Sequence, residues 1–303
     1  MLEITFDSCG WMLIFHMGVA QYLHEHLDLT KIKITSVSGG SLIGSALLSG
    51  VNIEFLFNEA IYFRSRYSEF SPYPLFNILN FVKGIINKYG DPDTTHKKLS
   101  SQMAVYLTEV YPDSGKMHHI KSFKDFDHFH DTVVASCTIP FINGLLPIEI
   151  KDNNGKMRYY YDGGFSDPMP QKTFNGDEML HNIRVSATSR EGIHDISLPC
   201  ESSWSWSFVP ARENTLYMIN KAGYLLAKRF FSINQRKFAS YFKPELKNMD
   251  DITFNDNDDK ELDIVSKHII ISAHKRNIKE HMIILGNIIS ILALCTIARR
   301  CFK

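Results

Sequence analysis

The chain has 303 residues, 44% of them hydrophobic and 12% aromatic, and its 33 Lys and Arg residues balance its 33 Asp and Glu residues to a formal net charge of zero. That length and apolar content suffice for one large domain with extensions, and the absence of a basic excess argues against a nucleic-acid binder. The five cysteines are scattered, odd in number and without CxxC spacing, so we expect no disulfide framework, no zinc site and a reducing compartment.

The N-terminal segment predicts a strand, a turn and a helix. Leu2–Phe6 alternates as a strand does, Asp7–Gly10 is a turn of small and polar residues, and a long apolar-faced helix is expected from about Trp11 to Leu27. The start, MLEITFDS, has no cationic region, so it is a poor signal peptide and we expect this domain in the cytosol. A turn of this kind either directs backbone N–H groups to a site for an oxyanion or is an ordinary loop.

The same pattern repeats over Lys31–Gly50. Alternating apolar residues up to Val37 predict a second strand, Ser38-Gly39-Gly40 interrupts it, and the run from Leu42 to Gly50 predicts a helix. A serine on a sharp strand-to-helix turn is exposed for attack and lies near a helix N-terminus that favours negative charge. Ser38 is therefore a candidate nucleophile, and a plain glycine turn is the alternative.

The middle of the chain is less informative. The Phe- and Tyr-rich residues from Val51 to Tyr89 predict helices that cover a sheet. Leu99–Tyr111 is predicted as an amphipathic helix, and Thr132–Ser136 as a short buried strand.

A hairpin is the next firm feature. A strand ending near Ile150 leads into the turn Asp152-Asn153-Asn154-Gly155, and Met157–Tyr161 returns as the second strand. The returning strand delivers Asp162-Gly163-Gly164. A carboxylate at the end of a strand can accept a proton if burial raises its pKa toward neutrality, and another glycine turn is the alternative.

The C-terminal part contains a predicted strand, a helix and two extensions. Asn182–Ala187 is predicted as a strand, Arg212–Ala239 as a helix, and Asp250–Asp263 as a solvated linker because it is rich in Asp and Asn. We expect four parts: a core over 1–180, a helical extension packed on it over 181–249, a polar linker over 250–281 and a membrane segment over 282–298.

The last of these, Met282–Ala298, is largely apolar, has no charged residue and has basic flanks. As a helix it would span roughly 25 Å, near the lower limit for crossing a bilayer. We favour a C-terminal membrane anchor over a buried core helix. The mitochondrial outer membrane, the endoplasmic reticulum and a lipid-droplet surface all fit.

Three stretches together carry a family resemblance: ITFDSCGWMLIFHMGVAQYLHEH, SVSGGSL and YDGGFSDPMP. They resemble the patatin-like phospholipase family, in particular its adipose triglyceride lipase and adiponutrin branch. The resemblance implies an α/β fold, a three-layer sandwich with a central, mostly parallel sheet. It also implies a Ser-Asp dyad without histidine, no metal and no other cofactor. Ser38 would be the nucleophile and Asp162 the base. The implied oxyanion donors are the backbone N–H groups of Ser8, Cys9, Gly10 and Gly39, and the surrounding motif residues are Ser36, Gly40, Gly163 and Gly164.

Three positions depart from the family pattern. Ser36 stands at the first glycine of the Gly-x-Ser-x-Gly elbow, and Ser8 and Leu13 stand where the oxyanion loop usually has glycine. A side chain at a position that needs positive φ would cost about 1 kcal/mol or more.

Three functions therefore remain. The first is an acyl hydrolase acting on phospholipid or neutral glycerolipid at a membrane or lipid-droplet surface. The second is a catalytically degenerate, membrane-anchored lipid-binding or scaffold protein with the same fold. The third is an acyltransferase that uses the same dyad. No protein partner is indicated.

Overall fold

The computed structural model describes residues 1–67, 73–113, 115–152, 154–170, 173–174, 181–187, 194–198, 204–246 and 252–275. Its centre is one eight-stranded sheet whose hydrogen-bonded pairs follow the path β5-β6-β3-β2-β1-β7-β8, and β4 also pairs with β3. The strands are β1 (Leu2–Phe6), β2 (Ile32–Val37), β3 (Met103–Tyr111), β4 (Lys116–Ile120), β5 (Ile148–Lys151), β6 (Met157–Asp162), β7 (His181–Ser186) and β8 (Ile196–Ser197). Every residue of β1 is buried, so both faces of the sheet are covered there.

The sheet is mixed and mostly parallel. β1 pairs in parallel with β2 and β7, β2 with β3, and β7 with β8. The pairs β3–β4, β3–β6 and β5–β6 are antiparallel. The α/β fold with a mostly parallel sheet expected from the sequence is therefore confirmed.

One feature of the strand register positions the candidate site. Val37 at the end of β2 pairs with Tyr106, and Asp162 at the end of β6 pairs with Leu107, the next residue of β3. Because β4 occupies the other side of β3 along this stretch, β2 and β6 lie end to end on the same side. The two strands run toward each other, so the residues at their carboxyl ends meet.

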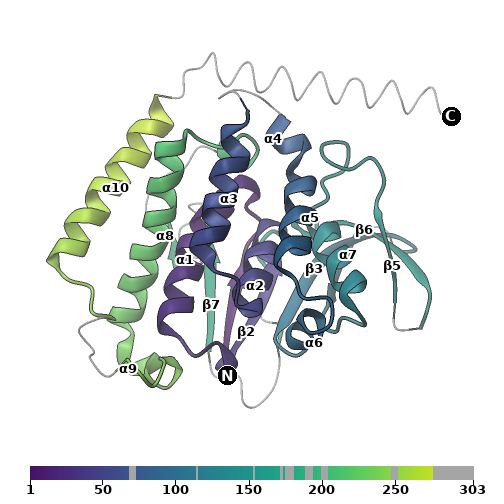
Figure 1. Ribbon diagram of the computed structural model, residues 1–303, viewed down its shortest axis with the longest axis horizontal. Helices are drawn as coiled ribbons and strands as arrows, with labels where there is room; N and C mark the ends of the chain where they lie inside the picture. Colours follow the sequence, from purple (N-terminus) through teal and green to yellow (C-terminus); the bar gives the residue numbers. More distant parts are fainter. Residues whose placement is uncertain are drawn as a thin grey trace.

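Ten helices are assigned in the described residues. They are α1 (Leu13–His26), α2 (Gly39–Ser49), α3 (Ile53–Ser65), α4 (Tyr73–Phe76), α5 (Ile78–Tyr89), α6 (Thr95–Leu99), α7 (Phe126–Ser136), α8 (Glu213–Ile233), α9 (Gln235–Phe238) and α10 (Asp256–His274). Figure 1 shows α10, α8 and α1 side by side, and α1 also packs against α2 and α3. The α1–α8 contact is close because a Cβ at Gly18 would lie 1.8 Å from Asn220 O, and one at Gly223 would lie 2.2 Å from Phe15 O.

Most predicted elements are confirmed: the first two strands, the helices that follow them, the helices within 51–89, the hairpin β5–β6, the strand at 182–187 and the long helix at 212–239. The predicted helix Leu99–Tyr111 is wrong, because most of it forms β3. This strand lies inside the sheet, and its first seven residues are all buried. A strand buried on both faces reads as a continuous apolar run, so the alternation that distinguishes a strand from a helix is lost.

The predicted strand Thr132–Ser136 is also wrong, because these residues form the last turns of α7. The helix begins at Asp125, whose side chain accepts a hydrogen bond from His128 N. This helix cap lies seven residues before Thr132, so the apolar run Thr132–Ser136 continues a helix that has already begun.

The predicted linker Asp250–Asp263 is contradicted by α10. Asn255 and Asp258 form a capping box, and the first turn carries three acidic residues that interact favourably with the helix dipole. The Asp and Asn residues that indicated a solvated coil instead cap α10 and form its first turn.

The expected boundary at residue 180 is displaced. β7 begins at His181 and pairs with the central strand β1, so the sheet extends past that position. The expected membrane segment 282–298 lies outside the described residues. Within the described ranges, no helix is both long enough and apolar enough to span a bilayer.

Candidate active site

Ser38 lies in the corner between β2 and α2. Its backbone has φ 53° and ψ −129°, a region that costs a non-glycine residue about 1–3 kcal/mol and persists only where the surrounding structure imposes it. The Ser38 N–H donates to Ser136 Oγ at 2.9 Å, and that hydroxyl donates onward to Tyr106 O at 2.9 Å. The corner is therefore held against β3 by a serine from the end of α7.

Two glycines allow the backbone to approach this closely. A Cβ at Gly40 would lie 2.7 Å from Asp7 O, and a Cβ at Gly163 would lie 2.4 Å from Tyr106 O. Both contacts are with backbone atoms that cannot move aside. These motif glycines are thus required by packing around Ser38 and Asp162.

Asp162 meets Ser38 at the junction of β6 and β2. Ser38 Oγ donates to Asp162 Oδ2 at 2.6 Å, and Gly164 N donates to Asp162 Oδ1 at 2.8 Å. The backbone of Asp162 is fixed as well, because its N–H donates to Thr138 O and its carbonyl accepts from Thr108 Oγ1, each at 2.8 Å. Both oxygens of the carboxyl group are therefore oriented before any ligand arrives.

Burial sets the acidity of this carboxyl group. Asp162 is only 3% exposed, and the loss of hydration raises its pKa from 3.8 to about 7, against the opposing effect of the hydrogen bonds from Ser38 and Gly164. A carboxylate with a pKa near neutrality accepts a proton far better than an ordinary aspartate. The pair therefore has the geometry and the basicity that removal of the Ser38 proton requires.

The loop after β1 supplies backbone donors next to this pair. Within the described residues, the N–H groups of Cys9, Gly10 and Gly39 have no acceptor. Gly10 has φ +53°, and a Cβ there would lie 2.1 Å from Ser207 O. The Ser8 N–H, by contrast, donates to Pro168 O at 2.8 Å. Ser8 is therefore not an available oxyanion donor, which corrects that part of the expectation.

The three positions that depart from the family pattern are accommodated without strain. Among the described non-glycine residues, positive φ occurs at Ser38 and Phe141, and not at Ser8, Leu13 or Ser36. Ser36 is buried, and its hydroxyl donates to Ala104 O at 3.3 Å. The backbone cost that a lost glycine could impose does not arise at these positions.

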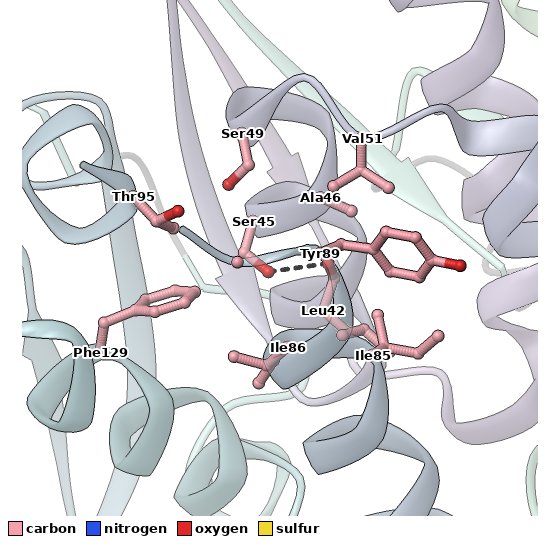
Figure 2. Close-up of a pocket in the computed structure, with 11 residues that line it drawn as sticks. Leu42, Ser45, Ala46, Ser49, Val51, Ile85, Ile86, Tyr89, Thr95 and Phe129 are labelled. Atoms are coloured by element: carbon pink, nitrogen blue, oxygen red, sulfur yellow. Dashed lines mark hydrogen bonds between the residues drawn. The ribbon is translucent and has the colours of Figure 1, made fainter. Parts of the chain in front are cut away.

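A small apolar pocket lies elsewhere, among α2, α5, α6 and α7 (Figure 2). Ser45 lies within it and donates its hydroxyl proton to Leu42 O at 2.9 Å. Neither Ser38 nor Asp162 lines this pocket. We therefore do not assign it to the candidate site.

Comparison with known proteins identifies the family. The family described as "Patatin-like phospholipase" matches residues 4–174, which is more than half of the chain. The chain belongs to the patatin-like phospholipase family. The matched range includes Ser38 and Asp162.

Three curated relatives show the range of this patatin-like group. Rat "Patatin-like phospholipase domain-containing protein 2" is 30% identical over 200 residues, which cover 62% of this chain and 38% of the relative. Its human counterpart is 28% identical over 195 residues, covering 62% and 36%. Human "1-acylglycerol-3-phosphate O-acyltransferase PNPLA3" is 28% identical over 266 residues, covering 81% and 53%. The chain thus spans between 36% and 53% of the length of these relatives.

Several residues of this patatin-like site were not predicted from the sequence. Ser136 was missed because its segment was interpreted as a strand, and a correct helix boundary at Asp125 would have placed it at a helix end. Asp7 and His16 contact each other beside the loop that follows β1, and their nine-residue separation gives no local signal of contact. Such contacts become visible only when β1 and α1 are packed together.

Proposed function

We propose that the chain is a serine acyl hydrolase that cleaves fatty-acyl esters of phospholipids or neutral glycerolipids. The observation that carries the proposal is the 2.6 Å hydrogen bond from Ser38 Oγ to the buried Asp162 carboxylate. Membership of the patatin-like phospholipase family supports the same reaction class. No cofactor is part of the proposal.

The proposed reaction passes through an acyl-enzyme. Asp162 takes the proton as Ser38 Oγ attacks the ester carbonyl carbon, and the N–H groups of Gly39, Cys9 and Gly10 are the proposed donors to the resulting oxyanion. Each such donor is typically worth about 3 kcal/mol in the transition state. The proton then passes to the departing alcohol. Asp162 next activates a water molecule, whose attack releases the fatty acid and regenerates Ser38.

Exposed apolar side chains in the segments before β5 and after β6 support a lipid substrate. Leu145 and Leu146 are 73% and 77% exposed in the loop before β5, and Phe165, three residues after Asp162, is 59% exposed. Tyr161 Oη donates to Leu145 O at 3.1 Å, which ties this loop to β6 beside the catalytic pair. Large apolar side chains this exposed are typical of surfaces that contact lipid or protein.

Acyl transfer is the second candidate, because one relative matched over 81% of this chain is named an acyltransferase. The acyl-enzyme would be the same, and an alcohol acceptor would replace water in the second step. The degenerate scaffold is less well supported, because Ser8, Leu13 and Ser36 adopt no positive φ. We further propose that residues 282–298 anchor the chain in a membrane with the catalytic part in the cytosol.

The test compares the full chain with Ser38→Ala, Asp162→Asn and the control Ser45→Ala in mild detergent. We expect a fluorophosphonate probe to label the wild type and Ser45→Ala, and to label neither of the other two. Fatty-acid release from phospholipid and triacylglycerol should follow the same order. Addition of a monoacylglycerol or lysophospholipid acceptor separates the two candidates, because a transferase would yield acylated acceptor in place of free fatty acid. Full activity in folded Ser38→Ala would refute both.

A further inference from the structure

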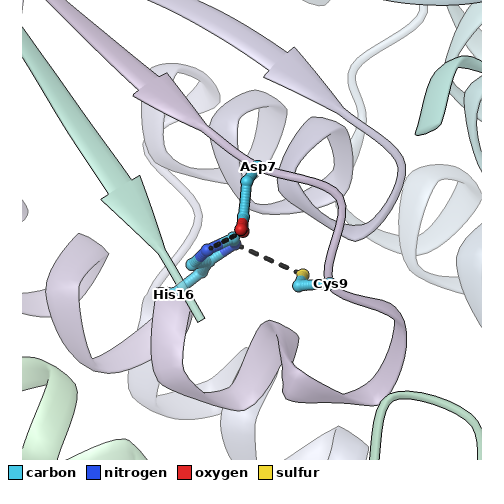
Figure 3. A group of neighbouring side chains, drawn as sticks. All are labelled: Asp7, Cys9 and His16. Carbon is cyan, nitrogen blue, oxygen red and sulfur yellow. Dashed lines mark hydrogen bonds and ion pairs between the residues drawn. The ribbon is translucent and has the colours of Figure 1, made fainter. Parts of the chain in front are cut away.

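Three buried side chains meet behind the oxyanion loop (Figure 3). Asp7 follows β1, Cys9 precedes the short 3-10 helix Gly10–Met12, and His16 lies in the first turn of α1. Cys9 Sγ is 3.4 Å from His16 Nδ1, and His16 Nε2 is 3.0 Å from Asp7 Oδ1. All three residues are at most 3% exposed. The imidazole ring therefore lies between a thiol and a carboxylate, with one nitrogen facing each.

The carboxylate end of this arrangement is fixed by the sheet. Ser186 Oγ at the end of β7 donates to Asp7 Oδ2, and Ala187 N donates to Asp7 Oδ1 at 3.3 Å. The His16 Nε2 contact is at ion-pair distance, although the N–H direction is off the line to the oxygen. A proton on Nε2 is still favoured, because a ring lone pair facing a buried carboxylate would be repelled. Nδ1 is then left to accept from the Cys9 thiol.

The thiol end contacts the first turn of α2. A Cβ at Gly39 would lie 2.9 Å from Cys9 Sγ, so the sulfur packs directly on Gly39. Cys9 Sγ also lies 3.8 Å from Gly10 O, a longer contact than the 3.4 Å to His16 Nδ1. Cys9 thus joins His16 to the turn that carries Ser38 and the Gly39 N–H, and its own backbone belongs to the oxyanion loop.

We propose that Asp7, His16 and Cys9 form a buried relay that positions the oxyanion donors of the loop and of Gly39 relative to Ser38. The proposal rests on the proposed function, and it makes the three side chains positioning residues. It accounts for a carboxylate, an imidazole and a thiol buried together beside a site whose chemistry uses none of them.

Two other interpretations fit the geometry less well. A thiol nucleophile would need an accessible thiolate, whereas Cys9 is 2% exposed and burial raises the pKa of its thiol well above the ordinary value. One ligand atom from each residue lies within 4.8 Å of the other two, which is close enough for a metal ion. A metal would however need the Cys9 thiolate, whereas burial raises the pKa of this thiol well above its ordinary value and favours the protonated form that donates to His16.

The kinetic test measures kcat and KM on a soluble short-chain ester for Cys9→Ala, Cys9→Ser and His16→Gln. Misplaced donors should lower kcat by about 10- to 100-fold in Cys9→Ala and His16→Gln, with KM within about twofold. Cys9→Ser keeps a hydroxyl donor to Nδ1 and should recover most of the loss. The matched control is Ser45→Ala, a buried hydroxyl in α2 that donates to Leu42 O and is no part of the relay, and it should leave kcat unchanged. A folded Cys9→Ala variant with wild-type kcat would overturn the proposal.

A spectroscopic test does not depend on turnover. In protein labelled with ¹⁵N-histidine, long-range ¹H–¹⁵N correlation should show a proton on His16 Nε2 and none on Nδ1, with the Nδ1 shift changed by Cys9→Ala and not by Ser45→Ala. A proton on Nδ1 would refute the relay. So would a cobalt–thiolate absorption band on Co²⁺ addition that disappears in Cys9→Ala, because it would make the cluster a metal site. An inactive wild type with the expected tautomer would refute the proposed function and leave the relay supported as a structural arrangement.

Discussion

Replacing Asp162 with asparagine should stabilise the folded protein at neutral and alkaline pH while it removes the proposed base. Burial raises the pKa of this carboxyl group from 3.8 to about 7 in the folded state. Because the folded pKa is raised, the stability contributed by the protonated group is fully present below the unfolded pKa and is lost as the pH rises through the folded pKa. A shift of roughly three pH units corresponds to about 4 kcal/mol. Asparagine has nearly the same shape and can still accept a hydrogen bond from Gly164 N–H. It should therefore retain the geometry without the free-energy cost of ionising a buried carboxyl group.

The assay is urea denaturation of the full chain in mild detergent, for wild type and Asp162→Asn, at several values from about pH 4 to about pH 8. The free energy of unfolding of the variant minus that of the wild type should grow by about 3–4 kcal/mol over this range. Asp113→Asn is the control, because that side chain is 55% exposed and makes only a long ion pair of 3.8 Å with Lys116. A difference between Asp162→Asn and wild type that stays constant with pH would refute the account of a buried, destabilised carboxylate.

Three further predictions concern the base, the tight corner and the lipid surface. Hydrolysis of a soluble ester should rise with pH and level off above the pKa of Asp162, about 7, because the base must be unprotonated; a pH profile of kcat/KM that is flat across this range would contradict its role. Gly40→Ala should lower the free energy of unfolding by about 2–4 kcal/mol, because its Cβ would lie 2.7 Å from a carbonyl oxygen. The control Gly115→Ala should lower it by about 1 kcal/mol, because Gly115 has φ +76° and open space around it. Equal urea midpoints for the two variants would contradict this reasoning. The double variant Leu145→Ser and Leu146→Ser should hydrolyse lipid in vesicles several-fold more slowly than wild type and a soluble ester at an unchanged rate, and equal losses on both substrates would argue against a lipid-contacting loop.

Local sequence determined the elements whose signals are short-range. The alternation of Leu2–Phe6, the small residues at Ser38-Gly39-Gly40 and the turn before Met157–Tyr161 each lie within one element and its flanks. Together with the family motifs, they were enough to predict an α/β fold and to select Ser38 and Asp162 as candidates. They could not show that the two side chains meet, because 124 positions separate them along the chain.

The contact between Ser38 and Asp162 depends on the tertiary pairing of β2 and β6 with β3. Val37 and Asp162 pair with adjacent residues of β3, so two strands from distant parts of the chain end at one point. The sequence did not predict β3 as a strand, because burial on both faces removes the alternation of apolar and polar residues that marks a strand.

Packing also decided which polar groups are available for chemistry. The Ser8 N–H is already bonded to Pro168 O, whereas the Gly39 N–H has no acceptor within the described ranges. The buried group of Asp7, Cys9 and His16 likewise exists only once α1 lies against the ends of β1 and β7. Hydrogen bonding and burial are properties of neighbours in space, so sequence alone determined the candidates, and the fold decided their partners and their acidity.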